Sequence, residues 1–359
     1  MIKPLTSLRF FFALLVFFMH VSFCFPAAIN ASWYLQIENH FFKEGFVGVG
    51  FFFTLSGFIL SYSYEKKILN SDISYKDFLV ARIARIYPLH IVTMLLAAPL
   101  MLSDFLHNKI LWLVKLVCNL LLVQSFISYE HVYSSFNMVS WSLSDEMFFY
   151  ALFPILIFFV SRNAKNKYVL ISLLILVPVI VFLLGDHRPW YNFYINPFLR
   201  VTDFILGILL YKLSKQAKAI SFAKASILEI AAIGLLITFF SINAYIPEVY
   251  RYSCFYWLPI AVIIFIFSMS KGWLSNILSS KYLVLLGEIS FAFYLLHDLV
   301  LRGVKIASKR FYQFDSVVLI IISLVLTIAL SYFFHKRVEL PMNIYIKKRW
   351  ANRKKVQVS

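Results

Sequence analysis

The chain has 359 residues, of which 61% are hydrophobic and only 14% are charged. Soluble domains are roughly half apolar and about one quarter charged, so this composition excludes an ordinary soluble globular protein. The 34 Lys and Arg residues exceed the 17 Asp and Glu residues. The excess lies between apolar segments and in the tail, as expected of a membrane protein whose cytoplasmic loops are enriched in Lys and Arg. We therefore expect the lipid bilayer as a partner and no nucleic acid.

Eleven apolar segments follow one another along the chain, each close to the ~20 residues that a helix needs to cross a bilayer. The first is expected to be retained as a span, because residues 24–26 make a poor signal-peptide cleavage site. The pattern predicts an all-α fold, a polytopic transmembrane helical bundle. The segments are 8–25, 46–63, 86–102, 110–127, 146–160, 168–184, 197–211, 226–242, 255–269, 283–301 and 316–335.

Clusters of basic residues assign the sides of the membrane. Those at 66–85, 162–167, 212–224 and 336–355 mark the cytoplasm. Three apolar segments separate the first two clusters, although an even number of crossings is required between them. We expect 110–127 to be the segment that does not cross, as a re-entrant or shallow element. About ten spans plus this segment then place both termini in the cytoplasm.

Two features complete the predicted organisation. The sequence lacks a long polar stretch or a repeat, which predicts a transmembrane domain at 1–340 and a basic cytoplasmic tail at 341–359. Residues 302–310 hold four basic residues and are expected to form a loop outside, against the charge rule. That conflict indicates either a purpose for the loop or an error in the last hairpin.

The first span carries two polar residues, Arg9 and His20. They are eleven residues apart, which is three helical turns, so they share nearly one face and lie about 16 Å apart along the axis. An imidazole in hydrocarbon is costly unless it faces a polar cavity, which makes His20 a functional candidate. The alternative is a histidine bonded to a neighbouring helix.

Arg82 and Arg85 are three residues apart and therefore face the same way at the membrane surface. Guanidinium groups bind phosphate oxygens through paired hydrogen bonds, so the two residues form a candidate phosphate site. An ordinary basic flank of a span would give the same spacing. Both interpretations remain open at this point.

The segment that begins at Trp141 places Asp145 and Glu146 before a strongly aromatic stretch that contains Tyr150. Carboxylates are favourable at a helix N-terminus, so capping is the alternative to a functional role. His297 ends another apolar stretch near the outer interface, and functional and interfacial interpretations of it are equally open.

Arg200 and Asp203 share one face of a span and are expected to be a structural ion pair. The three cysteines have neither metal-ligand spacing nor an even count. We expect no metal site.

These strings, in this order, resemble the acyltransferase 3 family, which includes membrane O-acetyltransferases of lipopolysaccharide and exopolysaccharide. The resemblance covers nearly the entire chain. Asp145 and Leu296 depart from the residues that relatives often carry. The matching strings are Arg9 with His20, Ser56-Gly57-Phe58, Arg82 and Arg85 with Tyr87-Pro88, Trp141 to Glu146 with Phe149, Tyr150 and Pro154, and Glu339-Leu340-Pro341.

The resemblance implies an O-acyltransferase of the cell (inner or plasma) membrane. Its donor would be acetyl-CoA or another acyl-CoA, with the phosphates on Arg9, Arg82 and Arg85. The acceptor would be a hydroxyl of a cell-surface or lipid-linked carbohydrate. His20 would take the proton of that hydroxyl or carry the acyl group itself, and both routes stay open.

The remaining expected roles concern the acceptor. Glu146 would orient His20 or bind the acceptor, and the aromatic side chains of Trp141 and Tyr150 would stack on sugar rings. His297 is expected to contact the substrate. The alternative function is a transporter or flippase of a lipid-linked glycan, although the sequence has no visible internal repeat of the kind that such proteins often show.

Overall fold

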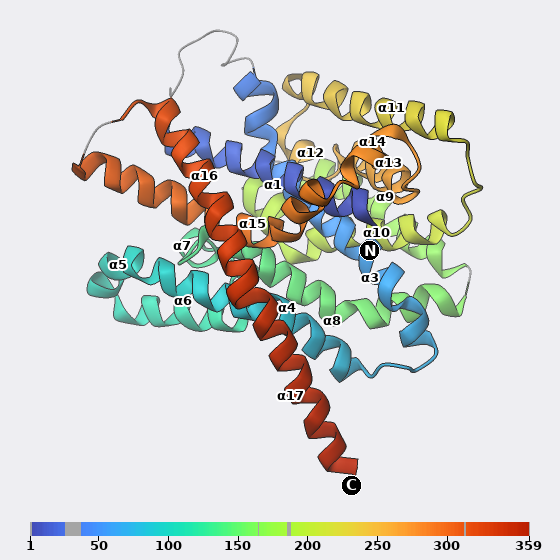
Figure 1. The fold of residues 1–359 in the computed structure, drawn as a ribbon, viewed down its shortest axis with the longest axis horizontal. Helices are drawn as coiled ribbons and strands as arrows, with labels where there is room; N and C mark the ends of the chain where they lie inside the picture. Colours follow the sequence, from blue (N-terminus) through green and yellow to red (C-terminus); the bar gives the residue numbers. More distant parts are fainter. Residues whose placement is uncertain (1, 26–36, 164, 185–187, 312–313, 359) are drawn as a thin grey trace. The chain divides into compact units, whose positions relative to one another are not determined.

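The computed structural model of the protein describes residues 2–25, 37–163, 165–184, 188–311 and 314–358, and these residues form helices and turns without a strand (Figure 1). Within them, nine helices are long and apolar enough to cross a membrane. The predicted all-α, polytopic bundle is confirmed. The nine candidate spans are Lys3–Cys24, Glu38–Leu69, Tyr75–His107, Met138–Arg162, Trp190–Ser214, Phe222–Ser241, Glu248–Ser268, Lys281–Phe311 and Ser316–Arg353.

Two helices outside this set correspond to the remaining predicted segments. Helix α9 (Asn166–Leu184) contains a shorter apolar stretch and supplies the tenth candidate. Helix α6 (Lys109–Leu121) has only 13 residues, which span about 20 Å and fall short of the ~30 Å hydrocarbon layer. It packs beside the short α5 (Leu102–His107). The short length of α6 supports the prediction that segment 110–127 does not cross.

The chain divides into two compact units. Unit 1 comprises residues 1–65, 155–290 and 315–317, and unit 2 comprises residues 66–154, 291–314 and 318–359. Helices α8 (Trp141–Arg162) and α15 (Lys281–Phe311) contribute residues to both.

Unit 1 is built around α1 (Lys3–Cys24), α3 (Val47–Leu69) and α10 (Pro197–Ser214). A side chain at Gly57 would overlap the carbonyl oxygen of Phe204, and one at Gly207 would overlap that of Thr54. Such close crossing of membrane helices requires small residues. Its other elements are η1 (Glu38–Phe42), η2 (Lys43–Phe46), η6 (Trp190–Ile195), α11 (Phe222–Ser241), η7 (Asn243–Tyr245), α12 (Glu248–Tyr252), α13 (Trp257–Ser268) and α14 (Trp273–Leu278).

Unit 2 contains α4 (Tyr75–Ala97) and a long C-terminal helical run. Figure 1 shows that run, in red, as one continuous rod from α16 (Ser316–Phe334) through η8 (His335–Glu339) to α17 (Leu340–Val358). Helix α17 packs on α4, and the Trp350 indole donates to the Asp77 carboxylate over 2.7 Å. The remaining short elements are η3 (Ala98–Met101), η4 (Gln124–Phe126), α7 (Glu130–Tyr133) and η5 (Met138–Ser140).

One expectation about the last hairpin is wrong. Residues 302–310, predicted as an outer loop, are the final turns of α15, which continues to Phe311. Arg302 forms an ion pair with Asp298 one turn earlier, over 2.9 Å. The basic residues are therefore compatible with a helix, because a nearby carboxylate balances the first of them.

Candidate active site

His20 lies near the end of α1 and is buried. Its Nδ1 is 2.9 Å from the carbonyl oxygen of Val16, one turn earlier on the same helix. A carbonyl only accepts hydrogen bonds, so Nδ1 carries the proton and, in the neutral ring, Nε2 keeps its lone pair. The bond to Val16 thus fixes the ring tautomer in which Nε2 is the basic nitrogen.

The helix that carries His20 is held closely by its neighbours in unit 1. Element η2 packs on α1, and a side chain at Gly45 would overlap the carbonyl oxygen of Leu15. Arg9, on the same helix, is partly buried. Since η2 leaves no room for movement at Leu15, it supports the part of α1 that carries His20.

Arg85 and Arg82 lie on α4 in unit 2, where Arg85 forms an ion pair with the buried carboxylate of Glu339. Its guanidinium also lies over the ring of Phe291, 5.4 Å from the centroid. Lys347 of α17 interacts electrostatically with both arginines. A guanidinium has five donors, so the pair with Glu339 leaves donors for an anion. The three cations favour a phosphate-bearing ligand.

Arg82 also connects the cationic group to α8. Its guanidinium carbon lies 5.9 Å from the centroid of the Tyr150 ring, and the Tyr150 hydroxyl donates to Glu146 over 3.0 Å. Neither Asp145 nor Glu146 lies in the first turn of α8, so helix capping does not explain them. The structure thus brings Arg82, Tyr150 and Glu146 together within unit 2.

The start of α8 is tied to α15 near His297. Trp141 and His297 are both buried within the protein. The His297 Nδ1 lies 2.6 Å from the Tyr294 carbonyl oxygen, and the Tyr294 hydroxyl donates to Ser142 over 3.0 Å. These bonds fix the helix end that presents Trp141.

Arg9 and His20 belong to unit 1, whereas the other six predicted site residues belong to unit 2. The proposed pairing of His20 with Glu146 therefore stays a prediction. The predicted Arg200 and Asp203 pair is present in unit 1, with 2.9 Å between guanidinium and carboxylate. Within the described ranges, no group of three or more His, Cys, Asp or Glu side chains is suited to hold a metal ion.

Sequence reasoning gave no role to Glu339 or Lys347. Glu339 accepts from Arg85 and lies 2.9 Å from the His335 ring, and it belongs to the Glu-Leu-Pro string that the resemblance had already marked. The sequence around Lys347 does not distinguish it from the many other basic residues in the tail.

Comparisons with known proteins identify the family of the chain. The family model described as "Acyltransferase domain", Acyl_transf_3, matches residues 3–336. The chain belongs to this family. The assignment confirms the resemblance drawn from the ordered motifs and makes the protein an acyltransferase. No solved structure matches the chain.

Two similar proteins bear names that describe acyl transfer. Acyltransferase MdmB of Streptomyces mycarofaciens is 30% identical over 326 residues, which cover 84% of this chain and 79% of that protein. A Staphylococcus aureus (strain COL) protein that bears the name "Putative O-acetyltransferase" is 27% identical over 294 residues. That alignment covers 75% of this chain and 48% of the S. aureus protein, so this chain matches only about half of the S. aureus protein.

Proposed function

We propose that this acyltransferase moves an acetyl group, or another acyl group, from acyl-CoA to a hydroxyl of a cell-surface or lipid-linked carbohydrate. The observation that carries the proposal is the bond between His20 Nδ1 and the Val16 carbonyl, which leaves Nε2 as the basic nitrogen. Membership in an acyltransferase family favours this activity over the alternative of a transporter or flippase.

The donor binds through its phosphates to the cations of unit 2. Arg82 and Arg85 lie on the half of α4 that follows the basic residues 66–76, which the charge rule assigns to the cytoplasm. Lys347 of α17 interacts electrostatically with both arginines. Acyl-CoA is made and kept in the cytoplasm, so this side is the one that the donor reaches. Arg9 adds a further contact in the proposal.

The chemistry follows one of two routes. In the first, the acceptor oxygen attacks the thioester carbonyl carbon while His20 Nε2 takes the hydroxyl proton, the C–S bond breaks, and the CoA thiolate leaves and is then protonated. In the second, Nε2 attacks the thioester carbonyl carbon, the C–S bond breaks, and the CoA thiolate leaves and is protonated by solvent. The acceptor oxygen then attacks the acyl-imidazole carbonyl carbon, the N–C bond breaks, and the hydroxyl proton passes through the imidazole to solvent. Glu146 orients the reacting groups, and Trp141, Tyr150 and His297 contact the acceptor.

The purified protein in lipid nanodiscs tests the donor and the product. Radiolabelled acetyl-CoA and surface polysaccharide from cells lacking the gene, stripped of esters by mild alkali, are the substrates. The expected result is label in alkali-labile esters of the polysaccharide, together with an equal amount of free CoA thiol. Thiol release without ester formation, or no release at all, would contradict the proposed function.

The sidedness of the reaction is tested in sealed vesicles of known orientation. We propose a multi-pass protein of the inner or plasma membrane with both termini in the cytoplasm, so acetyl-CoA should be used only from the cytoplasmic face. The impermeant polysaccharide should be used only from the opposite face. Use of both substrates from the cytoplasmic face would replace this arrangement with acylation of a cytoplasmic precursor.

A further inference from the structure

Unit 2 contains a fully buried network of uncharged polar side chains that the proposed chemistry does not use. It comprises His90 on α4, Asn119 on α6, and Gln124, Asn137 and Ser140 between α6 and α8, each at most 1% exposed. Buried polar groups are costly unless they are hydrogen-bonded, and inside a membrane protein they mark functional positions. We call these five residues the α4–α6 network.

Hydrogen bonds join the five residues into one chain. His90 Nε2 lies 2.9 Å from the backbone oxygen of Asn119, and the Ser140 hydroxyl donates to Asn119 Oδ1 over 3.2 Å. Gln124 Nε2 donates to the Ser140 carbonyl over 3.0 Å, and the Ser140 amide donates to the Asn137 carbonyl over 2.9 Å. The side chains therefore lie close to one another around Ser140.

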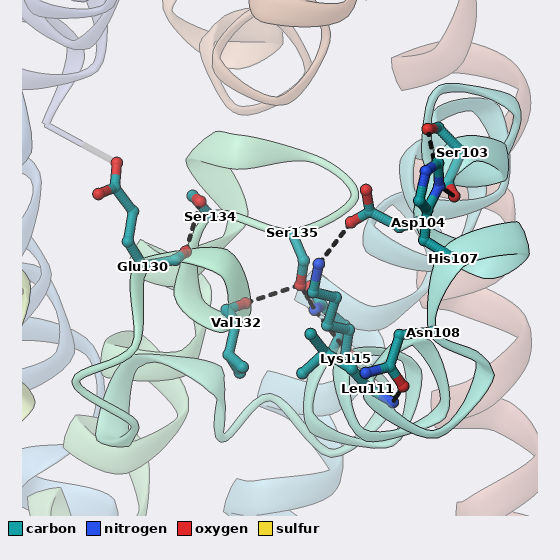
Figure 2. A network of polar contacts seen from close by, with 11 residues as sticks. Ser103, Asp104, His107, Asn108, Leu111, Lys115, Glu130, Val132, Ser134 and Ser135 are labelled. Atoms are coloured by element: carbon teal, nitrogen blue, oxygen red, sulfur yellow. Dashed lines mark hydrogen bonds and ion pairs between the residues drawn. The ribbon is translucent and has the colours of Figure 1, made fainter.

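The network extends to the molecular surface along the α5 and α6 pair. Asn119 also donates to the Ser135 hydroxyl over 2.8 Å, and Figure 2 shows Ser135 beside the Lys115 side chain, which reaches toward Asp104. Lys115 is buried, whereas the side chain of Asp104 is 42% exposed. A polar route thus connects the buried residues to the outside of unit 2.

Three atoms of the network have no hydrogen-bond partner among the described residues, and all three are acceptors. They are His90 Nδ1, Gln124 Oε1 and Asn137 Oδ1. The acceptor role of each atom follows from the bond made by a nitrogen of the same side chain. His90 Nε2 and Gln124 Nε2 each bond to a backbone carbonyl oxygen, and Asn137 Nδ2 donates to Leu295 O over 2.8 Å. Because a carbonyl oxygen only accepts, these nitrogens are the donors and the remaining atoms are acceptors. A buried acceptor without a donor costs free energy, so each of the three atoms favours a ligand that brings a donor.

We propose that the α4–α6 network binds hydroxyl groups of the carbohydrate acceptor, an inference that rests on the proposed function. Hydroxyl groups donate to all three acceptor atoms, whereas an apolar ligand would leave them unpaired. The Trp112 ring lies on α6 and the Phe136 ring directly precedes Asn137 in the chain, with the ring centroids 5.7 Å apart. Aromatic rings beside polar groups suit the C–H faces and hydroxyls of a sugar.

The network lies close to the donor-binding arginines along α4. Helix α4 begins at Tyr75 and ends at Ala97, and His90 follows Arg85 by five residues, roughly 7.5 Å at the usual helical rise. An acceptor hydroxyl bound at the network would therefore lie near the donor-binding groups of the same helix.

The test measures Michaelis constants for both substrates in nanodiscs, with the ester-free surface polysaccharide and acetyl-CoA as probes. His90→Gln keeps an N–H at the Nε2 position but loses the Nδ1 acceptor, and Gln124→Met loses its acceptor outright. Each should raise the KM for polysaccharide roughly fivefold or more, as loss of a hydrogen bond of about 1 kcal/mol does, without changing the KM for acetyl-CoA. Thr327→Val, which removes a buried hydroxyl on α16 outside the network, is the control and should change neither constant.

Hydrogen exchange of the parent protein tests the acceptor site without a substitution, so it applies even where a variant does not fold. The polysaccharide should slow amide exchange at residues 115–140, and acetyl-CoA should not. Ester formation by the parent with unchanged polysaccharide KM in both variants would overturn the acceptor site and leave the proposed function standing. Absence of ester formation would remove the proposed function, and unchanged exchange with polysaccharide would remove the acceptor site independently.

Discussion

The two units of the chain treat buried charge differently. In unit 1, two buried carboxylates each pair with one arginine, Asp203 with Arg200 and Glu44 with Arg251. Unit 2 instead groups Arg82, Arg85 and Lys347 around an ion pair with Glu339, and it holds a network of neutral side chains with open acceptors. We therefore propose that these two pairs of unit 1 stabilise the fold, whereas the cations and open acceptors of unit 2 bind ligands.

The largest effect on stability should come from breaking a pair in unit 1. Asp203→Ala leaves the Arg200 guanidinium buried without its carboxylate, which typically costs about 3–5 kcal/mol. Thermal unfolding in detergent should show a large fall in midpoint, while the protein that remains folded keeps its affinity for acetyl-CoA. Glu248→Ala is the control, because Glu248 is an exposed partner of Arg251 at 3.5 Å and such pairs contribute at most about 1 kcal/mol. Equal unfolding midpoints for both variants would remove the structural role of the pair.

A smaller effect, on binding, should come from the cations of unit 2. The double variant Arg82→Lys with Arg85→Lys keeps both charges but loses the planar donors that pair with phosphate oxygens. We expect the acetyl-CoA dissociation constant to rise roughly tenfold, since hydrogen bonds between charged groups contribute about 1.5–3 kcal/mol. Lys218→Ala, at an exposed position in unit 1, should leave the constant unchanged. Donor binding equal to the parent in the double variant would refute paired hydrogen bonding.

The smallest effect should come from the contact that holds α17 on α4. Trp350→Phe keeps the aromatic ring but removes the bond to Asp77, worth about 1 kcal/mol. Because α17 carries Lys347, the acetyl-CoA dissociation constant should rise roughly twofold. Tyr345→Phe removes an exposed bond on the same helix and should have no effect on acetyl-CoA binding. A rise of the same size in both variants would mean that the contact with α4 is irrelevant to the donor.

The helices were predictable because the length of an apolar segment is a local property. The extension of α15 to Phe311 was not, since Lys305, Lys309 and Arg310 have the composition of a loop and only the pairing of Arg302 with Asp298 indicates a helix. The packing of unit 1 depends on close approach of helices at Gly57 and Gly207. The sequence shows these glycines but not which helix each one contacts.

The site was predictable where a polar residue interrupts an apolar segment, as at His20. The pairing of Arg85 with Glu339 joins residues 254 positions apart, and no spacing rule reaches across that distance. His90 and Asn119 were visible as polar residues in apolar segments, yet their shared network depends on how α4 and α6 pack. Spacing along one helix is readable from the sequence, whereas contacts between distant helices need the structure.

The most direct test of the account separates chemistry from donor binding in one variant. His20→Ala is compared with the parent for equilibrium binding of acetyl-CoA and for single-turnover transfer to the polysaccharide. General base catalysis contributes roughly 10²–10⁴-fold, so transfer should fall by at least the lower figure, while donor binding and the unfolding midpoint stay at the parent's values. Transfer near the parent's rate by a well-folded His20→Ala protein would contradict the central role of His20.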